Sequence, residues 1–142
     1  MKENLETKIE GSYSFKSEGE KRIAEVLNKY RIDFKYEWPV LIKDDDKKLR
    51  IWYPDFFLSK HGVYLEYFGY DNNPDYDNGR KRKEKIYKEM KMDVISIDSK
   101  IRGDNQLENH LINQLYRIQT RRLSEIKSKI YTLRTSLGKK YF

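Results

Sequence analysis

The 142-residue sequence has no cysteine and only two histidines. Disulfide bonds and zinc sites built from thiolates are therefore excluded, and two histidines are too few for an imidazole-based metal centre. No hydrophobic run approaches the roughly 20 residues that cross a bilayer, and residues 1–6 lack the apolar segment of a signal peptide. We therefore expect an intracellular protein, in the cytoplasm or at the nucleoid, with no membrane partner.

Hydrophobic residues make up only 37% of the chain, but aromatic residues reach 14% and include 12 tyrosines. Because aromatic rings bury large areas, we expect one folded domain with a small core rather than a disordered chain.

The net charge of +7 is unevenly distributed. Residues 1–70 hold 13 basic and 13 acidic side chains, whereas residues 71–142 hold 17 basic and 10 acidic side chains. An excess of this kind is expected if one face of the protein meets a polyanion such as DNA. A solvated, lysine-rich surface would give the same count.

The pattern of apolar residues predicts an alternation of helices and strands. A first helix is expected to begin at Ser17, because Ser17 and Glu20 have the spacing of a capping box. The other expected elements are strands over 34–42, 49–58, 63–70 and 93–97, a helix over 75–91, and one long helix or two over 104–137.

These elements predict a layered α/β/α core with a mixed central sheet of about four strands. The expected strands over 49–58 and 63–70 carry apolar residues at both parities, so both of their faces should be covered. We divide the chain into a polar leader (1–16), a core domain (17–103) and a basic, helical C-terminal extension (104–142).

Two carboxylates lie inside apolar, strand-forming runs, Asp55 and Glu66. A carboxylate in such a place is costly unless something compensates it, and a metal ion is a frequent compensator. A loop of two or four residues centred between Lys60 and His61 would make the two acids direct cross-strand partners. A turn at His61 and Gly62 would instead make them diagonal neighbours on one face. In either arrangement the two carboxylates repel each other, and Mg²⁺ or Mn²⁺ would suit the all-oxygen site between them.

Glu20 and Lys83 are two further candidates. Glu20 lies at the edge of the apolar stripe of the first helix, where it could be a metal ligand, the acid of the capping box, or both. Lys83 lies on the inward side of the second predicted helix, where an ammonium needs an anionic partner or must snorkel to solvent. The surrounding basic run, residues 80–85, is either a solvated face or a phosphate-binding surface.

The order of these residues resembles the PD-(D/E)XK nuclease superfamily. Glu20 on a first helix, then Pro54-Asp55, then Glu66-Tyr67-Phe68 follow its pattern, except that Phe68 stands where the superfamily has a lysine. The resemblance covers about residues 17–98.

The sequence also resembles one branch of that superfamily, found with UvrD-like and helicase IV-like proteins, on residues 64–69, Tyr76, Lys83, Tyr87 and 94–97. In that branch the lysine has moved to the following helix. Phe68 shares a strand face with Glu66, so a helix over that face would return an ammonium to the same volume. We expect Lys83 to take the place of that lysine, with Lys85 and Arg80 as the alternatives.

The resemblance implies a restriction-endonuclease-like fold and a metal-dependent DNA endonuclease, acting in repair, recombination, or a mobile-element or phage context. Asp55, Glu66 and the backbone carbonyl of Tyr67 would hold Mg²⁺ or Mn²⁺, with Glu20 binding directly or through water. Lys83 would orient the nucleophile or stabilise developing charge. The basic side chains expected to contact DNA are Arg80, Lys81, Lys85, Arg121 and Arg122. A helicase or another protein partner fits this branch, and a non-catalytic nucleic-acid-binding module on a degenerate nuclease fold is the alternative.

The C-terminal extension lies outside the resemblance and carries two apolar stripes. Leu107, Leu111, Leu115 and Ile118 form the first, which we expect to pack on the core. The second has the heptad-like 3-4-3-4 spacing and consists of Leu123, Ile126, Ile130, Leu133 and Leu137. Residues 117–142 hold eight basic side chains and one acidic side chain. Packing, homodimerisation and a basic arm on DNA are the alternatives for the second stripe, and an interface is favoured.

Overall fold

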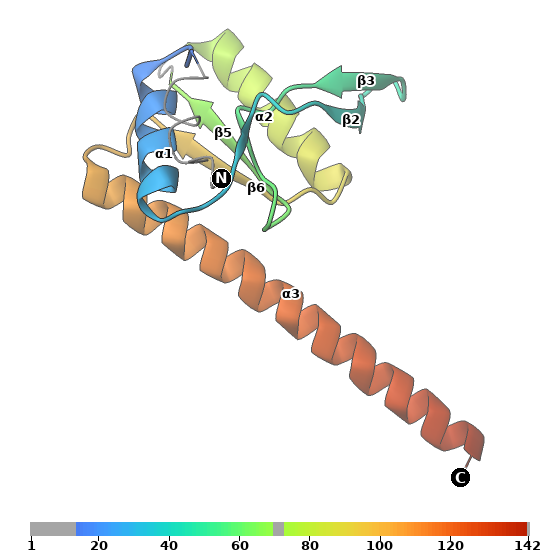
Figure 1. Cartoon of the computed structure of the whole chain (residues 1–142). Helices are drawn as coiled ribbons and strands as arrows, with labels where there is room; N and C mark the ends of the chain where they lie inside the picture. The colour runs from blue at the N-terminus through green and yellow to red at the C-terminus, as the bar shows by residue number, and fades with distance from the viewer. Residues whose placement is uncertain (1–13, 70–72, 142) are drawn as a thin grey trace, which may run out of the picture. The chain divides into compact units, whose positions relative to one another are not determined.

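The computed structural model describes residues 14–69 and 73–141, so most of the expected leader, as well as residues 70–72, lies outside the described residues (Figure 1). The chain divides into two compact units, Met1–Leu107 and Glu108–Phe142. The elements are α1 (Glu18–Lys29), β1 (Lys35–Tyr36), β2 (Val40–Lys43), β3 (Leu49–Trp52), β4 (Phe56–Leu58), β5 (Val63–Phe68), α2 (Pro74–Glu89), β6 (Val94–Asp98) and α3 (Asp104–Tyr141).

The first unit is built on a four-stranded mixed sheet with the order β1-β4-β5-β6. β1 pairs antiparallel with β4, and β4 pairs antiparallel with β5, whereas β5 and β6 run parallel and are joined through α2. A parallel pair needs such a crossover, because a tight turn can join only antiparallel strands. The predicted mixed α/β fold with about four strands and a long C-terminal helix is therefore confirmed.

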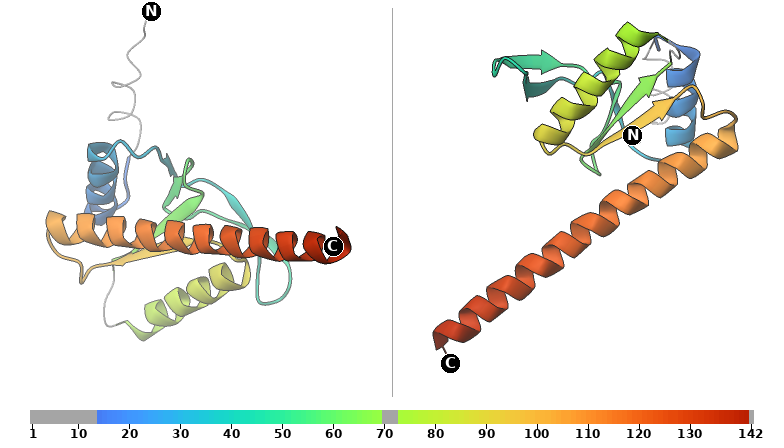
Figure 2. Two further views of the ribbon diagram at one scale, coloured as in Figure 1. Left: turned by 90° about the horizontal axis from the view of Figure 1, so that it is seen from below. Right: turned by 180° about the vertical axis from the view of Figure 1, so that it is seen from behind.

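The helices α1 and α2 lie on opposite faces of this sheet (Figure 2). Alternate side chains of β5 face one helix or the other. On the α1 side the ring of Tyr67 lies so close to Gly19 that a Cβ added there would meet the ring Cζ at 2.1 Å. On the α2 side Glu66 contacts Tyr87. The buried side chains between the layers include Ile23, Leu27, Phe56, Leu58, Leu65, Ile86, Ile95 and Ile97.

The two predicted strands over 34–42 and 49–58 are each broken once, which corrects the expectation of two continuous strands. β2 and β3 form a separate two-stranded sheet. Both breaks contain a proline, Pro39 or Pro54, which lacks the N–H that a ladder requires.

The hairpin nevertheless keeps one register across the break. Tyr36 pairs with Phe56 on one side and Val40 with Trp52 on the other. Between them the Glu37 N–H donates to the Asp55 carbonyl at 2.9 Å, with Glu37 in the left-handed region at φ 49°. The break is therefore a bend in one long hairpin, and Asp55 lies at that bend.

The local signals at the element ends behave as expected. Ser17 is the N-cap of α1, and its hydroxyl accepts from the Glu20 N–H at 3.1 Å. Asn73 caps α2, with Pro74 as the first helical residue. The region over 104–141 is a single helix rather than two. Within the described ranges, none of the helices has both the length and the apolar character required to cross a membrane.

Candidate active site

The β4–β5 hairpin brings the two strand carboxylates together. Phe56 pairs with Leu65 and Leu58 pairs with Val63, which leaves a four-residue loop over 59–62. Extended by one residue, this register sets Asp55 opposite Glu66. The direct cross-strand arrangement is therefore confirmed, and the diagonal alternative is wrong.

Asp55 is tied to the neighbouring strand by a backbone hydrogen bond. Its Oδ2 accepts from the Tyr67 N–H at 2.7 Å. This bond fixes the carboxylate beside the peptide that follows Glu66. The peptide bond after Glu66 and both candidate acids thus belong to one rigid strand pair.

Glu66 is the more deeply buried of the two acids, with 3% of its side chain exposed. Its Oε1 accepts from the Tyr87 hydroxyl and lies 3.3 Å from the Lys83 Nζ. Lys83 and Tyr87 are one turn apart on α2, so both side chains point from the same helix face toward β5. The Tyr87 ring is held by an edge-to-face contact with Trp52, at 5.7 Å between centroids.

Asp55, Glu66, Tyr67 and Lys83 all line one open pocket of about 500 Å³. The rest of its lining comes mainly from β3 and α2: Trp52, Phe68, Asp75, Tyr76, Gly79, Arg80 and Arg82. A larger hollow of about 990 Å³ runs along α1, but Lys and Glu side chains of an exposed helix face line it and none of the predicted site residues does. The smaller pocket is favoured as the site, because the acidic Asp55 and Glu66 and the basic Lys83 all line it.

The electrostatics of the pocket leave its two carboxylates under-compensated. Burial, followed by repulsion from Glu66, raises the pKa of Asp55 to about 8. The Tyr67 N–H and the Lys83 ammonium oppose this rise but do not cancel it. Burial and the charge of Glu66 also raise the pKa of the Tyr87 hydroxyl, which therefore remains a donor at all ordinary pH values.

Glu20 has a well-defined structural role at the start of α1. Its Oε2 accepts from the Lys16 N–H at 2.9 Å and from the Tyr36 hydroxyl at 2.8 Å, and the residue is 6% exposed. Glu20 is thus the acid of the capping box, but its carboxylate accepts from the N–H of Lys16, the residue before the N-cap Ser17. Glu20 does not line the pocket, although its charge is close enough to contribute to the raised pKa of Asp55.

The donor set at the pocket consists of oxygen atoms only, which fits a hard divalent cation. Asp55, Glu66 and the Tyr67 carbonyl belong to the same strand pair, and the raised pKa of Asp55 indicates a carboxylate that a cation would stabilise. Over residues 14–69 and 73–141, however, no three His, Cys, Asp or Glu side chains form a cluster that could hold a metal ion. A ligand role for Glu20 stays a prediction.

Phe68 occupies the position where the superfamily pattern has a lysine. Its ring lies under the Arg80 guanidinium, 4.6 Å from the ring centroid, and in edge contact with Tyr76. Arg80 is further bound by Glu84 at 3.0 Å and Asp98 at 3.5 Å. Arg80, expected to contact DNA, is therefore engaged with the protein itself.

The other basic residues expected to bind DNA differ in their surroundings. Lys85 lies 4.0 Å from Asp45 and 3.8 Å from Glu89, and Lys81 is exposed on α2. In the second unit, Arg121 pairs with Glu125 at 3.4 Å. Ion pairs at exposed positions are weak, so these contacts would not prevent binding to phosphates.

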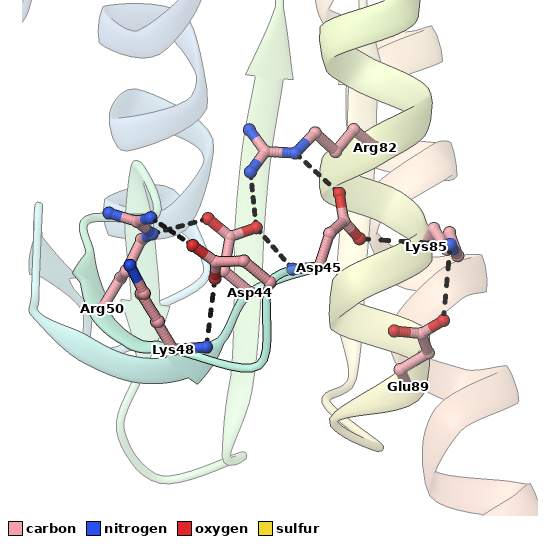
Figure 3. A network of polar contacts seen from close by, with 8 residues as sticks. Asp44, Asp45, Lys48, Arg50, Arg82, Lys85 and Glu89 are labelled. Atoms are coloured by element: carbon pink, nitrogen blue, oxygen red, sulfur yellow. Dashed lines mark hydrogen bonds and ion pairs between the residues drawn. The ribbon is translucent and has the colours of Figure 1, made fainter.

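A third buried acid, Asp44, was not singled out from the sequence. It lies in the turn between β2 and β3, where 5% of its side chain is exposed, and it accepts from Arg50 at 2.7 Å and from Arg82 (Figure 3). Arg82 also donates to Asp45 at 3.0 Å. This network joins the tip of the hairpin to α2. The alternation of side chains along the extended chain could have identified Asp44 as buried, because it falls on the same face as the fully buried Ile42.

Comparisons with family models, with curated proteins and with solved structures found no match for this chain.

Proposed function

We propose that this protein is a metal-dependent endonuclease that hydrolyses DNA phosphodiester bonds. The observation that carries the proposal is the convergence of Asp55, Glu66 and Lys83 on one pocket, with the Lys83 Nζ 3.3 Å from Glu66. Two acids and one ammonium, from the bend before β4, from β5 and from α2, are groups that metal-assisted hydrolysis of a phosphodiester can use. A restriction-endonuclease-like core is part of the same proposal.

Asp55, Glu66 and the Tyr67 carbonyl would hold Mg²⁺ or Mn²⁺, with Glu20 reached through water. When bound there, the cation would lower the pKa of a water molecule and neutralise charge on the phosphate. Lys83 then has a role of its own. Its side chain is 43% exposed, so the ammonium can move from Glu66 toward a phosphate and stabilise the charge that develops during hydrolysis.

Tyr87 and Trp52 would act as positioning residues. Tyr87 donates to Glu66 and packs on Trp52, so it fixes the carboxylate without touching the substrate. The exposed Lys81 and the weakly paired Lys85 lie on the same helix as Lys83 and would contact the DNA backbone. Contacts of that kind position DNA without reading its sequence.

The test is cleavage of single-stranded, duplex and branched DNA with Mg²⁺ or Mn²⁺. We expect Asp55→Ala to abolish cleavage and Lys83→Ala to reduce it by about 100-fold. Lys88→Ala, an exposed lysine on the same helix, is the matched control and should change the rate less than about threefold. Absence of cleavage on every substrate, or wild-type cleavage by Asp55→Ala, would refute the proposal.

A second function is favoured by one specific observation. Phe68 and Arg80 fill the position of the missing lysine, as expected if the fold had kept nucleic-acid binding and lost catalysis. Mn²⁺ titration separates the two functions. An intact site binds Mn²⁺ in a way that depends on Asp55 and Glu66, whereas a degenerate site binds DNA without such a dependence.

A further inference from the structure

The second unit carries an apolar stripe that is exposed to solvent. Five side chains of α3, 47% to 62% exposed, form it: Leu123, Ile126, Ile130, Leu133 and Leu137. In the same helix, Leu107, Leu111 and Leu115 are 2% to 8% exposed. Three of the four residues of the first predicted stripe are thus buried, and Ile118 is half-buried, whereas the second stripe, here called the distal seam, is exposed. An exposed apolar stripe of this length on a well-formed helix indicates an interaction surface.

The distal seam has the geometry of a coiled-coil strand. With Leu123 at heptad position a, Ile126 falls at d, Ile130 at a, Leu133 at d and Leu137 at a. The same frame continues toward the N-terminus through a polar d position, Gln119, to Tyr116 and Ile112, which are also exposed.

The seam is two positions wide, and its flanks are polar throughout. Helices that lie on a membrane or pack on a globular core need a broader apolar face than a and d alone provide. A narrow seam is instead covered by one partner helix, whose knobs fit between its side chains.

The charges beside the seam decide which partner helix fits. The e positions hold Lys127 and Arg134, and the g positions hold Arg122, Lys129 and the neutral Ser136. The nearby acid Glu125 is at position c, on the outer side, where it pairs with Arg121.

A second copy of the chain would place like charges opposite each other. In a parallel pair, g positions face the e positions of the other helix, so Arg122 would meet Lys127 and Lys129 would meet Arg134. In an antiparallel pair, e faces e and g faces g, which again opposes basic side chains. Like charges at these positions disfavour self-association and select an oppositely charged partner.

We propose that the distal seam binds an amphipathic helix of a different protein, with apolar residues at a and d and acidic residues at e and g. DNA would satisfy the basic flanks but would leave the apolar seam in water, whereas an acidic helix satisfies both. The residues involved lie outside the candidate active site, so the proposal stands or fails independently of nuclease activity.

The experiment uses the full chain and two synthetic helical peptides, each roughly four heptads long with Leu at a and d. One peptide has Glu at e and g, and the other has Lys there. Fluorescence anisotropy at about 0.1 M salt should show binding of the Glu peptide at least about tenfold tighter than binding of the Lys peptide. Equal affinity for the two peptides would overturn the proposal.

Variants assign the binding to the seam and its flanks. Ile130→Asn should abolish binding of both peptides, and it replaces an exposed side chain, so the fold should survive. Reversing the flanks with Lys127→Glu, Lys129→Glu and Arg134→Glu together should reverse the preference between peptides. Ser128→Glu, which adds a negative charge at the outer f position, is the matched control and should leave the preference unchanged.

Two further outcomes would overturn the proposal. Sedimentation of the chain alone as a dimer that Ile130→Asn dissociates would assign the seam to a second copy. Loss of DNA binding in the flank-reversed variant, together with no binding of the Glu peptide, would assign the region to a basic arm on DNA.

Discussion

Asp44 and the pair Asp55–Glu66 are two acidic sites inside the fold, but the groups that surround them differ. Asp44 meets two guanidinium groups, those of Arg50 and Arg82, together with the Asp45 N–H. The Asp55–Glu66 pair, with two carboxylates, meets one ammonium, one hydroxyl and one backbone N–H. Asp44 alone is contacted by two guanidinium groups, which it shares with Asp45 and Asp46, whereas the two carboxylates of the pair share one ammonium.

The pKa values of the two sites move in opposite directions. The Asp45 N–H and then the Arg82 guanidinium lower the pKa of Asp44, whereas burial and Glu66 raise the pKa of Asp55. A carboxylate compensated by the protein's own cations holds the fold together. A carboxylate pair left short of positive charge is poised to take up a cation from outside, and this difference distinguishes a structural acid from a candidate catalytic one.

The largest expected difference is in metal affinity. Asp55→Asn should weaken Mn²⁺ binding by at least about 100-fold, because it removes a charged ligand. Asp44→Asn removes a buried acid outside the pocket and should change the affinity less than about twofold. Isothermal titration of both variants measures this difference, and equal losses in the two would contradict the distinction.

The next difference is the sign of the change in stability. At pH 7 with EDTA, Asp55→Asn should raise the free energy of unfolding by about 2 kcal/mol, because the folded wild type must take up a proton at Asp55, whereas the amide is already neutral and keeps an acceptor for the Tyr67 N–H. Asp44→Asn should lower it, because two guanidinium groups lose their charged partner. Urea unfolding measures both variants, and a loss of stability in Asp55→Asn would show that the pair is adequately compensated.

Local signals in the sequence were sufficient for the parts of the fold that depend on neighbouring residues. The spacing of Ser17 and Glu20 located the start of α1, and the loop after Leu58 narrowed the hairpin to two registers, of which the structure has the one that sets Asp55 opposite Glu66. The bend of the long hairpin was not predictable in the same way. Pro39 marks a local irregularity, but the separation into two sheets depends on contacts made elsewhere in the fold.

The candidate site also has features that local sequence signals predict and features that depend on contacts with distant residues. Strand parity, helix spacing and the family resemblance together favoured Lys83 as the lysine near Glu66, and the two side chains lie 3.3 Å apart in the structure. The role of Asp44 was hidden, because Arg82 is far from it in sequence and no periodicity connects a turn to a distant helix face. Glu20 was ambiguous between cap and ligand, and the structure adds its bonds to Lys16 and Tyr36 without testing the ligand role.

The dependence of stability on pH should also separate the two acidic sites. Since the folded-state pKa of Asp55 lies above its unfolded value, the folded state holds its proton between about pH 4 and 8, and stability falls as the pH rises through that window, by at most about 1.4 kcal/mol per unit. Asp44 has a lowered pKa, so its contribution is present at neutral pH and lost as the pH falls below the usual carboxyl range. Unfolding in EDTA measures both variants. Between pH 4 and 8 the free energy of unfolding should depend less on pH in Asp55→Asn than in the wild type, and Asp44→Asn should keep the wild-type dependence. An unchanged profile in Asp55→Asn would locate the titration elsewhere.

The smallest expected effect concerns the hydroxyl that holds Glu66. Tyr87→Phe removes the donor to Glu66 but keeps the ring against Trp52, so stability should fall by about 1 kcal/mol, the typical net value of one hydrogen bond. Tyr53→Phe removes a hydroxyl from a residue that is 59% exposed and should have no measurable effect.

In the Glu66→Gln background the loss of stability caused by Tyr87→Phe should be smaller, because the hydrogen bond between the two side chains is then no longer charge-assisted. A double-mutant cycle measures this coupling. A coupling of zero would mean that packing on Trp52 alone holds Tyr87. The Tyr87 hydroxyl would then not stabilise the Glu66 carboxylate, and the contrast with Asp44 would be larger.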